Sequence, residues 1–146
     1  MATSSAIDTL IELAVKETDE AAKRLGHAIR ACDEVTEKLN LLLRYRDEYA
    51  ARFQDNLSVG LSASGYRNFQ LFIDKLDNAA SSQQLVLLDA KRRIEEARTA
   101  WQASERKRMS YGTLASRALK EEQRKEAKRD QKATDEHAAR ANLYKR

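Results

Sequence analysis

The sequence predicts an all-α protein in which two long helices form an antiparallel coiled-coil hairpin, with residues 1–146 as a single domain. Composition is the first reason. The chain has 146 residues with no proline and four glycines, whereas average usage gives about seven prolines and about ten glycines at this length. Sheet proteins and doubly wound α/β domains need such residues in the turns after their elements. The second reason is an apolar stripe with helical spacing in each half of the chain.

We expect the first helix at about residues 4–57. Alternate steps of four and three residues from Ile7 to Phe53 meet apolar side chains at every position except Thr18 and Arg46. A repeat of 3.5 residues keeps one face of a helix turned toward a supercoiling partner. The pattern therefore predicts a left-handed coiled-coil seam along this helix.

We expect the turn at about residues 58–64, the one stretch between the two stripes that can reverse the chain. Half of the glycines lie in or beside it, at Gly60 and Gly65. Glycine tolerates the φ > 0 conformations that end a helix, and Ser62 or Ser64 can cap the helix that follows.

The second helix is expected at about residues 65–141. Its apolar stripe is clear from Tyr66 to Trp101 and weakens beyond that point. A turn near residue 60 would bring the two stripes into antiparallel register, with Phe53 near Tyr66.

Residues after about 115 would have no partner in this hairpin, because the second helix is longer than the first. This overhang is also basic, since residues 102–146 contain 13 lysines and arginines against 7 aspartates and glutamates. Charge pairs between residues four apart can hold a single helix of this composition.

Several function classes find no support in the sequence. There is no apolar run of about 18 residues that would span a membrane, and the N-terminus does not resemble a signal peptide. The single cysteine, Cys32, allows no internal disulfide. His27 and His137 lie far apart, so they form no metal site with the three or four ligands that zinc needs. Without a phosphate-binding loop either, we expect no enzyme activity, cofactor or metal.

One stretch beside the turn carries more apolar surface than a two-helix seam requires. At about 100° per residue, the apolar arc of residues 39–57 spans about 160°, which one partner helix cannot cover. Exposed apolar patches with aromatic residues usually bind proteins. The alternative is that self-association into a four-helix bundle covers the patch. The expected patch consists of Leu42, Tyr45, Tyr49, Phe72, Leu76 and Ala79.

The basic second half raises a different class of function, a coiled-coil adaptor that binds nucleic acid or a cytoskeletal partner. Runs such as 106–108 satisfy the first criterion for nucleic-acid binding. Acidic residues are interleaved throughout, however, and no aromatic residue lies among the basic runs. We therefore interpret them as a solvated face and expect no nucleic-acid partner, with the adaptor kept as the alternative.

Four segments of the chain carry a family resemblance, at residues 18–26, 45–49, 66–73 and 130–136. The aromatic placement after the turn and the C-terminal Asp-Gln-Lys segment are its more specific parts. In these segments the chain resembles the FliJ family, small components of the bacterial flagellar type III export apparatus. The resemblance runs along essentially the whole length.

The resemblance implies a fold and a set of partners. FliJ proteins are antiparallel coiled coils similar to the γ-subunit stalk of rotary ATP synthases. They sit in the central pore of the hexameric export ATPase FliI, contact the cytoplasmic domain of the export gate protein FlhA, and interact with export chaperones. The implied function is a non-enzymatic component that couples the ATPase ring to the gate and escorts exported proteins. The implied location is the cytoplasm, at the inner face of the plasma membrane under the flagellum, with membrane association only through partners.

The resemblance also assigns residues. It implies that the six-residue patch beside the turn is the gate-binding surface. Two flanking positions, Lys38 and Gln83, stand where the family leads us to expect glutamine and histidine. The paired ends of the helices would enter the ATPase ring. The seam residues at that end are Ile7, Ile11, Ala14, Tyr111 and Ala115.

Overall fold

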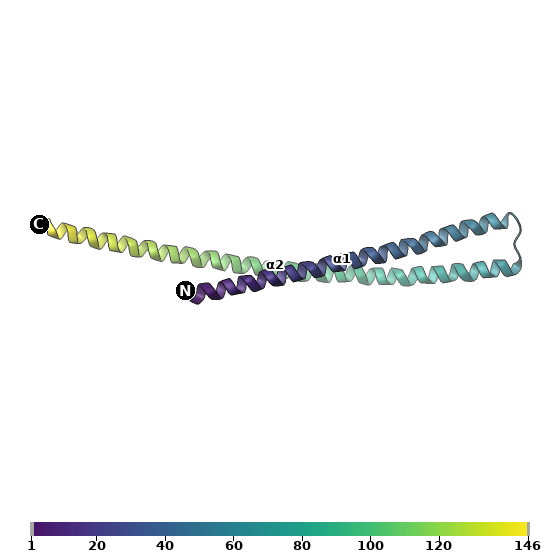
Figure 1. Ribbon diagram of the computed structural model, residues 1–146, viewed down its shortest axis with the longest axis horizontal. Coiled ribbons are helices and arrows are strands. Elements are labelled where there is room, and N and C mark those ends of the chain that lie inside the picture. Colours follow the sequence, from purple (N-terminus) through teal and green to yellow (C-terminus); the bar gives the residue numbers. More distant parts are fainter. Residues whose placement is uncertain (1, 146) are drawn as a thin grey trace. The chain divides into compact units, whose positions relative to one another are not determined.

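The computed structural model describes residues 2–145, and the side chains of residues 5–145. It contains two helices, α1 at Ala2–Leu57 and α2 at Ala63–Tyr144. The helices run in opposite directions from the turn that joins them (Figure 1), and no strand occurs in the described residues. This confirms the all-α helical hairpin that the sequence predicts.

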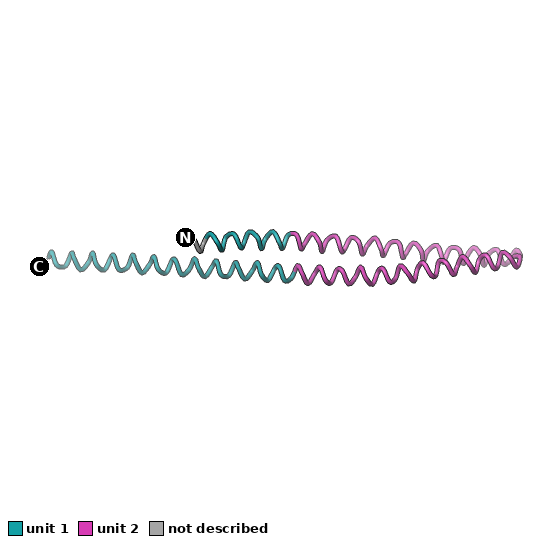
Figure 2. The backbone as a smooth tube through the Cα atoms, turned by 90° about the horizontal axis from the view of Figure 1, so that it is seen from below, with its two compact units in different colours: residues 1–19, 102–146 teal, residues 20–101 magenta. Residues whose placement is uncertain are grey.

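The contacts divide the chain into two compact units (Figure 2). Unit 2 is Glu20–Trp101, and it contains the turn with the adjoining parts of both helices. Unit 1 combines Met1–Asp19 with Gln102–Arg146, the two ends of the chain. Each unit therefore contains a stretch of α1 packed against a stretch of α2.

The seam follows the heptad stripe read from the sequence. Every stripe position of α1 from Ile7 to Phe53 is buried or half-buried, and so is every stripe position of α2 from Phe69 to Ala115. Most of the buried side chains are small, which allows close approach of two helices without an enclosed core. The buried apolar residues are Ala14, Ala21, Cys32, Leu39, Ala80 and Ala90.

The two polar interruptions of the α1 stripe are accommodated in different ways. Thr18 is only 5% exposed, and its hydroxyl donates a 2.8 Å hydrogen bond to the Ala14 carbonyl one turn earlier. The buried hydroxyl is therefore satisfied within α1. Arg46 instead reaches across the seam of unit 2 and pairs with Asp77 of α2.

The turn uses one glycine and one serine for distinct purposes. Gly60 has a φ of +98°, a conformation that other residues rarely adopt. The Gly65 amide donates a 3.2 Å hydrogen bond to the Ser62 hydroxyl, so Ser62 caps α2. An added Cβ at Gly65 would lie 3.0 Å from the Leu61 side chain. Gly65 thus lets Leu61 pack against the first turn of α2.

Aromatic contacts define the register of the hairpin near the turn. The expected pair, Phe53 and Tyr66, is present with ring centroids 5.8 Å apart. The closest partner of Phe53, however, is Phe69, with stacked rings 3.6 Å apart. Phe53 is therefore nearest to a residue almost one helical turn beyond the expected partner.

Candidate partner-binding site

An aromatic cluster joins the two helices of unit 2 close to the turn. Besides its contacts to Phe53, Phe69 stacks on Tyr49 with ring centroids 5.4 Å apart. Tyr49 also contacts Phe72, with centroids 4.5 Å apart and rings tilted by 53°. Such pairs add to the stabilisation from buried area. The cluster therefore gives this end of the hairpin a rigid base.

The patch expected from the sequence is partly exposed and partly built into the seam. Tyr45 is 55% exposed and Phe72 is 44% exposed, and Ala79 and Lys38 are exposed as well. The expectation of an exposed side chain is wrong for three members, because they occupy seam positions and are half-buried. These three are Leu42, Tyr49 and Leu76, and the flanking Gln83 is half-buried too.

The exposed members of the patch share one face on each helix. Phe72 and Ala79 are seven residues apart on α2, and a further heptad step leads to Val86, which is 48% exposed. Residues one heptad apart share a helix face. The sequence interpretation missed Val86, although the same heptad step could have found it. Tyr45 and Lys38 are likewise seven residues apart on α1.

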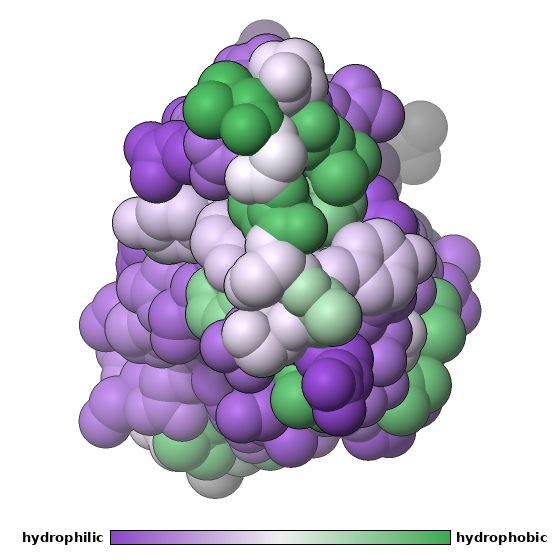
Figure 3. Space-filling model, turned by 90° about the vertical axis from the view of Figure 1, so that its right-hand side faces the viewer, coloured by the Kyte–Doolittle hydropathy of each residue, from purple (hydrophilic) through white to green (hydrophobic). Residues whose placement is uncertain are grey.

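Apolar exposure continues onto the turn itself. Figure 3 looks onto the turn end, where green and white residues gather and purple ones surround them. Val59 is 87% exposed there, and Leu57 and Leu61 are exposed beside it. An apolar surface of this kind is typical of protein-binding sites.

The second expected site, in unit 1, is mostly seam. Ala14 is buried, and the other four residues, Ile7, Ile11, Tyr111 and Ala115, are half-buried. Beside them the ammonium of Lys107 lies 3.6 Å from the Glu17 carboxylate of α1. It also lies 6.0 Å from the centre of the Tyr111 ring. Unit 1 therefore offers less apolar surface at these positions than the patch beside the turn.

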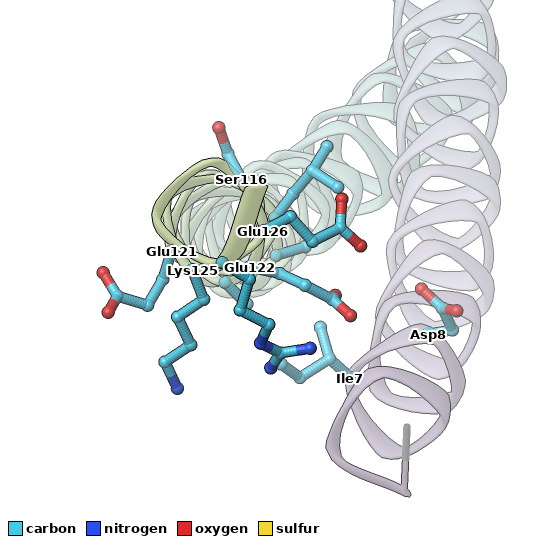
Figure 4. A pocket seen from close by; sticks show the side chains of 11 residues that line it. Ile7, Asp8, Ser116, Glu121, Glu122, Lys125 and Glu126 are labelled. Carbon is cyan, nitrogen blue, oxygen red and sulfur yellow. The ribbon is translucent and has the colours of Figure 1, made fainter. Parts of the chain in front are cut away.

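A groove opens in unit 1 beyond the last seam contacts. It encloses about 730 Å³ between the start of α1 and residues 115–129 of α2. Figure 4 shows Ile7 and Asp8 on α1 across from the lining residues of α2, which include Glu122 and Glu126. Four carboxylates, those of Asp8, Glu121, Glu122 and Glu126, line it against the two cations Lys125 and Arg129.

From residue 116 to residue 145 every residue is exposed, and all but the last belong to α2. This segment, the α2 tail, is held by pairs within the helix. Arg124 donates a 2.7 Å hydrogen bond to Glu121 and holds the pKa of that carboxyl below its usual value. In unit 2, Arg92 likewise hydrogen-bonds Asp89 and lowers the pKa of that carboxyl.

Comparison with known proteins assigns the chain to a family. The family model described as Flagellar FliJ protein matches residues 3–146. The Flagellar FliJ protein of Salmonella typhi is 32% identical over 145 residues, which cover 99% of each chain. The chain belongs to the FliJ family. The Flagellar FliJ protein of Escherichia coli (strain K12) is 31% identical over 145 residues, again 99% of each chain.

Neither a metal centre nor a membrane span is found in the described part of this FliJ-family chain. No group of three or more His, Cys, Asp or Glu side chains in residues 5–145 is placed to hold a metal ion. Neither described helix is long and apolar enough to cross a membrane.

Proposed function

We propose that this chain is a non-enzymatic component of the flagellar type III export apparatus that couples the export ATPase to the export gate. In this proposal the patch beside the turn binds the cytoplasmic domain of the gate protein FlhA. The paired helix ends of unit 1 and the adjoining groove bind the ATPase FliI. The chain works in the cytoplasm at the flagellar base, reaches the membrane through these partners, and escorts export substrates or their chaperones.

One observation supports the gate assignment most. Tyr45 and Phe72 are exposed on the two helices next to a rigid aromatic cluster. Aromatic side chains on a preorganised base are frequent hot spots, because little side-chain entropy is lost when a partner covers them.

The assignment of unit 1 to the ATPase rests on its different chemistry. The seam residues there are half-buried, while the groove beside them is open and lined mainly by charged side chains. Such a surface can contact a charged pore lining without a large apolar interface. This contact would be more sensitive to salt than the contact at the patch.

The arginines of the basic second helix do not support the alternative that the chain binds nucleic acid. Arg108 pairs with Glu105, and Arg124 pairs with Glu121, each on the same helix. A glutamate on the same helix therefore neutralises the charge of each of these arginines, which makes them less available to phosphate groups. Phosphate-dominated binding would fall steeply with salt concentration, so a salt titration with duplex DNA checks this interpretation.

The gate assignment is tested by replacing Tyr45 with alanine and measuring binding to the isolated cytoplasmic domain of the gate protein. Loss of a hot spot should weaken binding by about tenfold or more, with helical content unchanged. Leu71→Ala is the matched control, since Leu71 is exposed on α2 close to Phe72. Undiminished binding by Tyr45→Ala, and again by Phe72→Ala, would remove the patch from the proposal.

The ATPase assignment is tested by ending the chain after residue 115. This truncation removes most of the groove lining on α2 and leaves the patch intact. It should weaken binding to the ATPase more than binding to the gate protein. The reverse result would invert the assignment of the two ends.

A further inference from the structure

Arg46 is the one charged residue in the α1 seam between Ile7 and Phe53. Its guanidinium Nε hydrogen-bonds the Asp77 carboxylate of α2. Within unit 2, every other ion pair found joins residues of the same helix. The pair with Asp77 is therefore the charged contact in this unit that depends on how the two helices are aligned.

Away from the aromatic cluster, the apolar part of the seam distinguishes poorly between alignments. Many seam positions are alanine or leucine, and a heptad repeat returns similar residues every seven positions. A slip of one heptad would bring Leu76 opposite Phe53 in place of Phe69, so an apolar contact would still form. The slipped turn would be centred near Gly65, which can take the same backbone conformation as Gly60. The ring contacts of Tyr49 and Phe53 favour the observed register near the turn, but the rest of the seam does not distinguish it from the slipped one.

The row of residues that contains Asp77 does distinguish the alignments. One heptad on either side of Asp77, α2 has Gln70 and Gln84. Either slip would place an uncharged amide opposite Arg46, and only the observed register places a carboxylate there. A single polar residue at a seam position is a well-attested means of fixing register in coiled coils.

We propose that the Arg46–Asp77 pair, together with the aromatic cluster, fixes the register of the hairpin and thereby keeps Tyr45 and Phe72 in the alignment that partner binding requires. The effect on partner binding rests on the proposed function, whereas the effect on the register of the helices does not. Both side chains are close to half exposed, at 41% and 45%. Exposed pairs contribute little to stability, so the pair adds a small preference for the observed register to the preference that the aromatic contacts supply.

The register is tested by pulsed electron paramagnetic resonance on the full chain. Spin labels are attached at Glu48 and Lys91, both exposed in unit 2, after Cys32→Ala removes the native thiol. In the observed register the labelled residues are offset by about 25 Å along the helix axes. A slip toward Gln84 shortens this offset to about 15 Å, since seven residues span about 10 Å.

Asp77→Gln is the decisive variant, because it gives this position the same amide side chain as Gln70 and Gln84 and leaves the apolar seam intact. We expect a second, shorter distance in this variant and a single distance in the parent chain. The double exchange Arg46→Asp with Asp77→Arg should restore the single distance. Arg44→Met, which removes an exposed arginine of the same helix, should leave the single distance unchanged.

A single unshifted distance in both Asp77→Gln and Arg46→Met would overturn the proposal. These measurements require no partner, so they stand even if the patch does not bind the gate protein. Where the patch does bind, Asp77→Gln should weaken binding in proportion to the slipped fraction. The double exchange should restore that affinity, whereas a direct contact of Asp77 with the partner would not be rescued by it.

Discussion

The region beside the turn and the α2 tail are both helical, but for different physical reasons. Beside the turn, aromatic rings from two helices stack at centroid distances of 3.6–5.8 Å. In the tail, residues 116–145 are all exposed, and the helix depends on contacts within itself, such as Arg124 with Glu121. The comparison shows that helical structure alone does not indicate where the molecule is rigid.

The difference has a thermodynamic consequence. Most helical stability in proteins comes from packing of an apolar face, which is present beside the turn and absent in the tail. Pairs between residues three or four apart contribute only about 0.2–0.5 kcal/mol each. The region beside the turn is therefore suited to presenting a fixed surface, and the tail to adapting its structure to a partner.

Phe53→Ala should have the largest effect on stability of the substitutions that compare the region beside the turn with the α2 tail. Phe53 contacts Tyr66 and Phe69, so its truncation should lower the free energy of unfolding by about 2–3 kcal/mol. Leu119→Ala in the tail, where the side chain is exposed, should change it by less than about 0.5 kcal/mol. Urea unfolding followed by circular dichroism measures both. Equal effects would contradict the distinction between the two regions.

The next effect concerns the turn. Gly60→Ala places a side chain at a φ of +98°, which costs roughly 1–2 kcal/mol. The matched control is Gly26→Ala, because Gly26 lies inside α1 with room for a methyl group. Thermal unfolding should show a lower midpoint for the first variant only. A lower midpoint for both would assign the effect to lost backbone flexibility in general.

A smaller effect of opposite sign is expected at Gly112 in unit 1. An added Cβ there meets no atom within 4 Å, and glycine inside a helix costs about 0.5–1 kcal/mol relative to alanine. Gly112→Ala should therefore raise helical content and slow amide hydrogen exchange around residue 112. Faster exchange in the variant would show that the glycine supports a contact within this unit.

The smallest effect is the titration of the tail carboxylate. The pKa of Glu121 is lower in the folded helix than its ordinary value of 4.5. The ionised carboxylate therefore stabilises the helix fully above pH 4.5, and this stabilisation is lost as the pH falls through the lowered pKa. Arg124→Gln removes the main cause, so the pKa of Glu121 should rise toward 4.5. Carboxyl NMR titration measures the shift, and an unchanged pKa would contradict this ion pair in solution.

Most of the fold could be predicted because it depends on a repeat. Steps from Ile7 and Tyr66 identified nearly all seam positions, since burial in a two-helix hairpin follows heptad spacing. Tyr66 is exposed because it lies at the start of the α2 stripe. The nearest partner of Phe53 could not be predicted as well, because stacking of individual rings depends on rotamers that spacing does not specify.

The candidate site could be predicted less completely. An excess apolar arc shows that extra surface exists, but not which members of the arc the second helix covers. Leu42, Tyr49 and Leu76 belong to both the arc and the seam, and the seam buries half of each. The ion-pair partner of Arg46 could not be predicted either, because it depends on the side of the seam toward which the guanidinium turns.

Site-specific photo-crosslinking most directly tests the central claim that the patch beside the turn and the groove of unit 1 bind different partners. A photoreactive phenylalanine analogue is placed at Lys38 beside the patch or at Leu119 in the groove, both exposed positions. With gate protein and ATPase both present, the proposal predicts gate adducts from position 38 and ATPase adducts from position 119. Gate adducts from position 119 together with none from position 38 would contradict it.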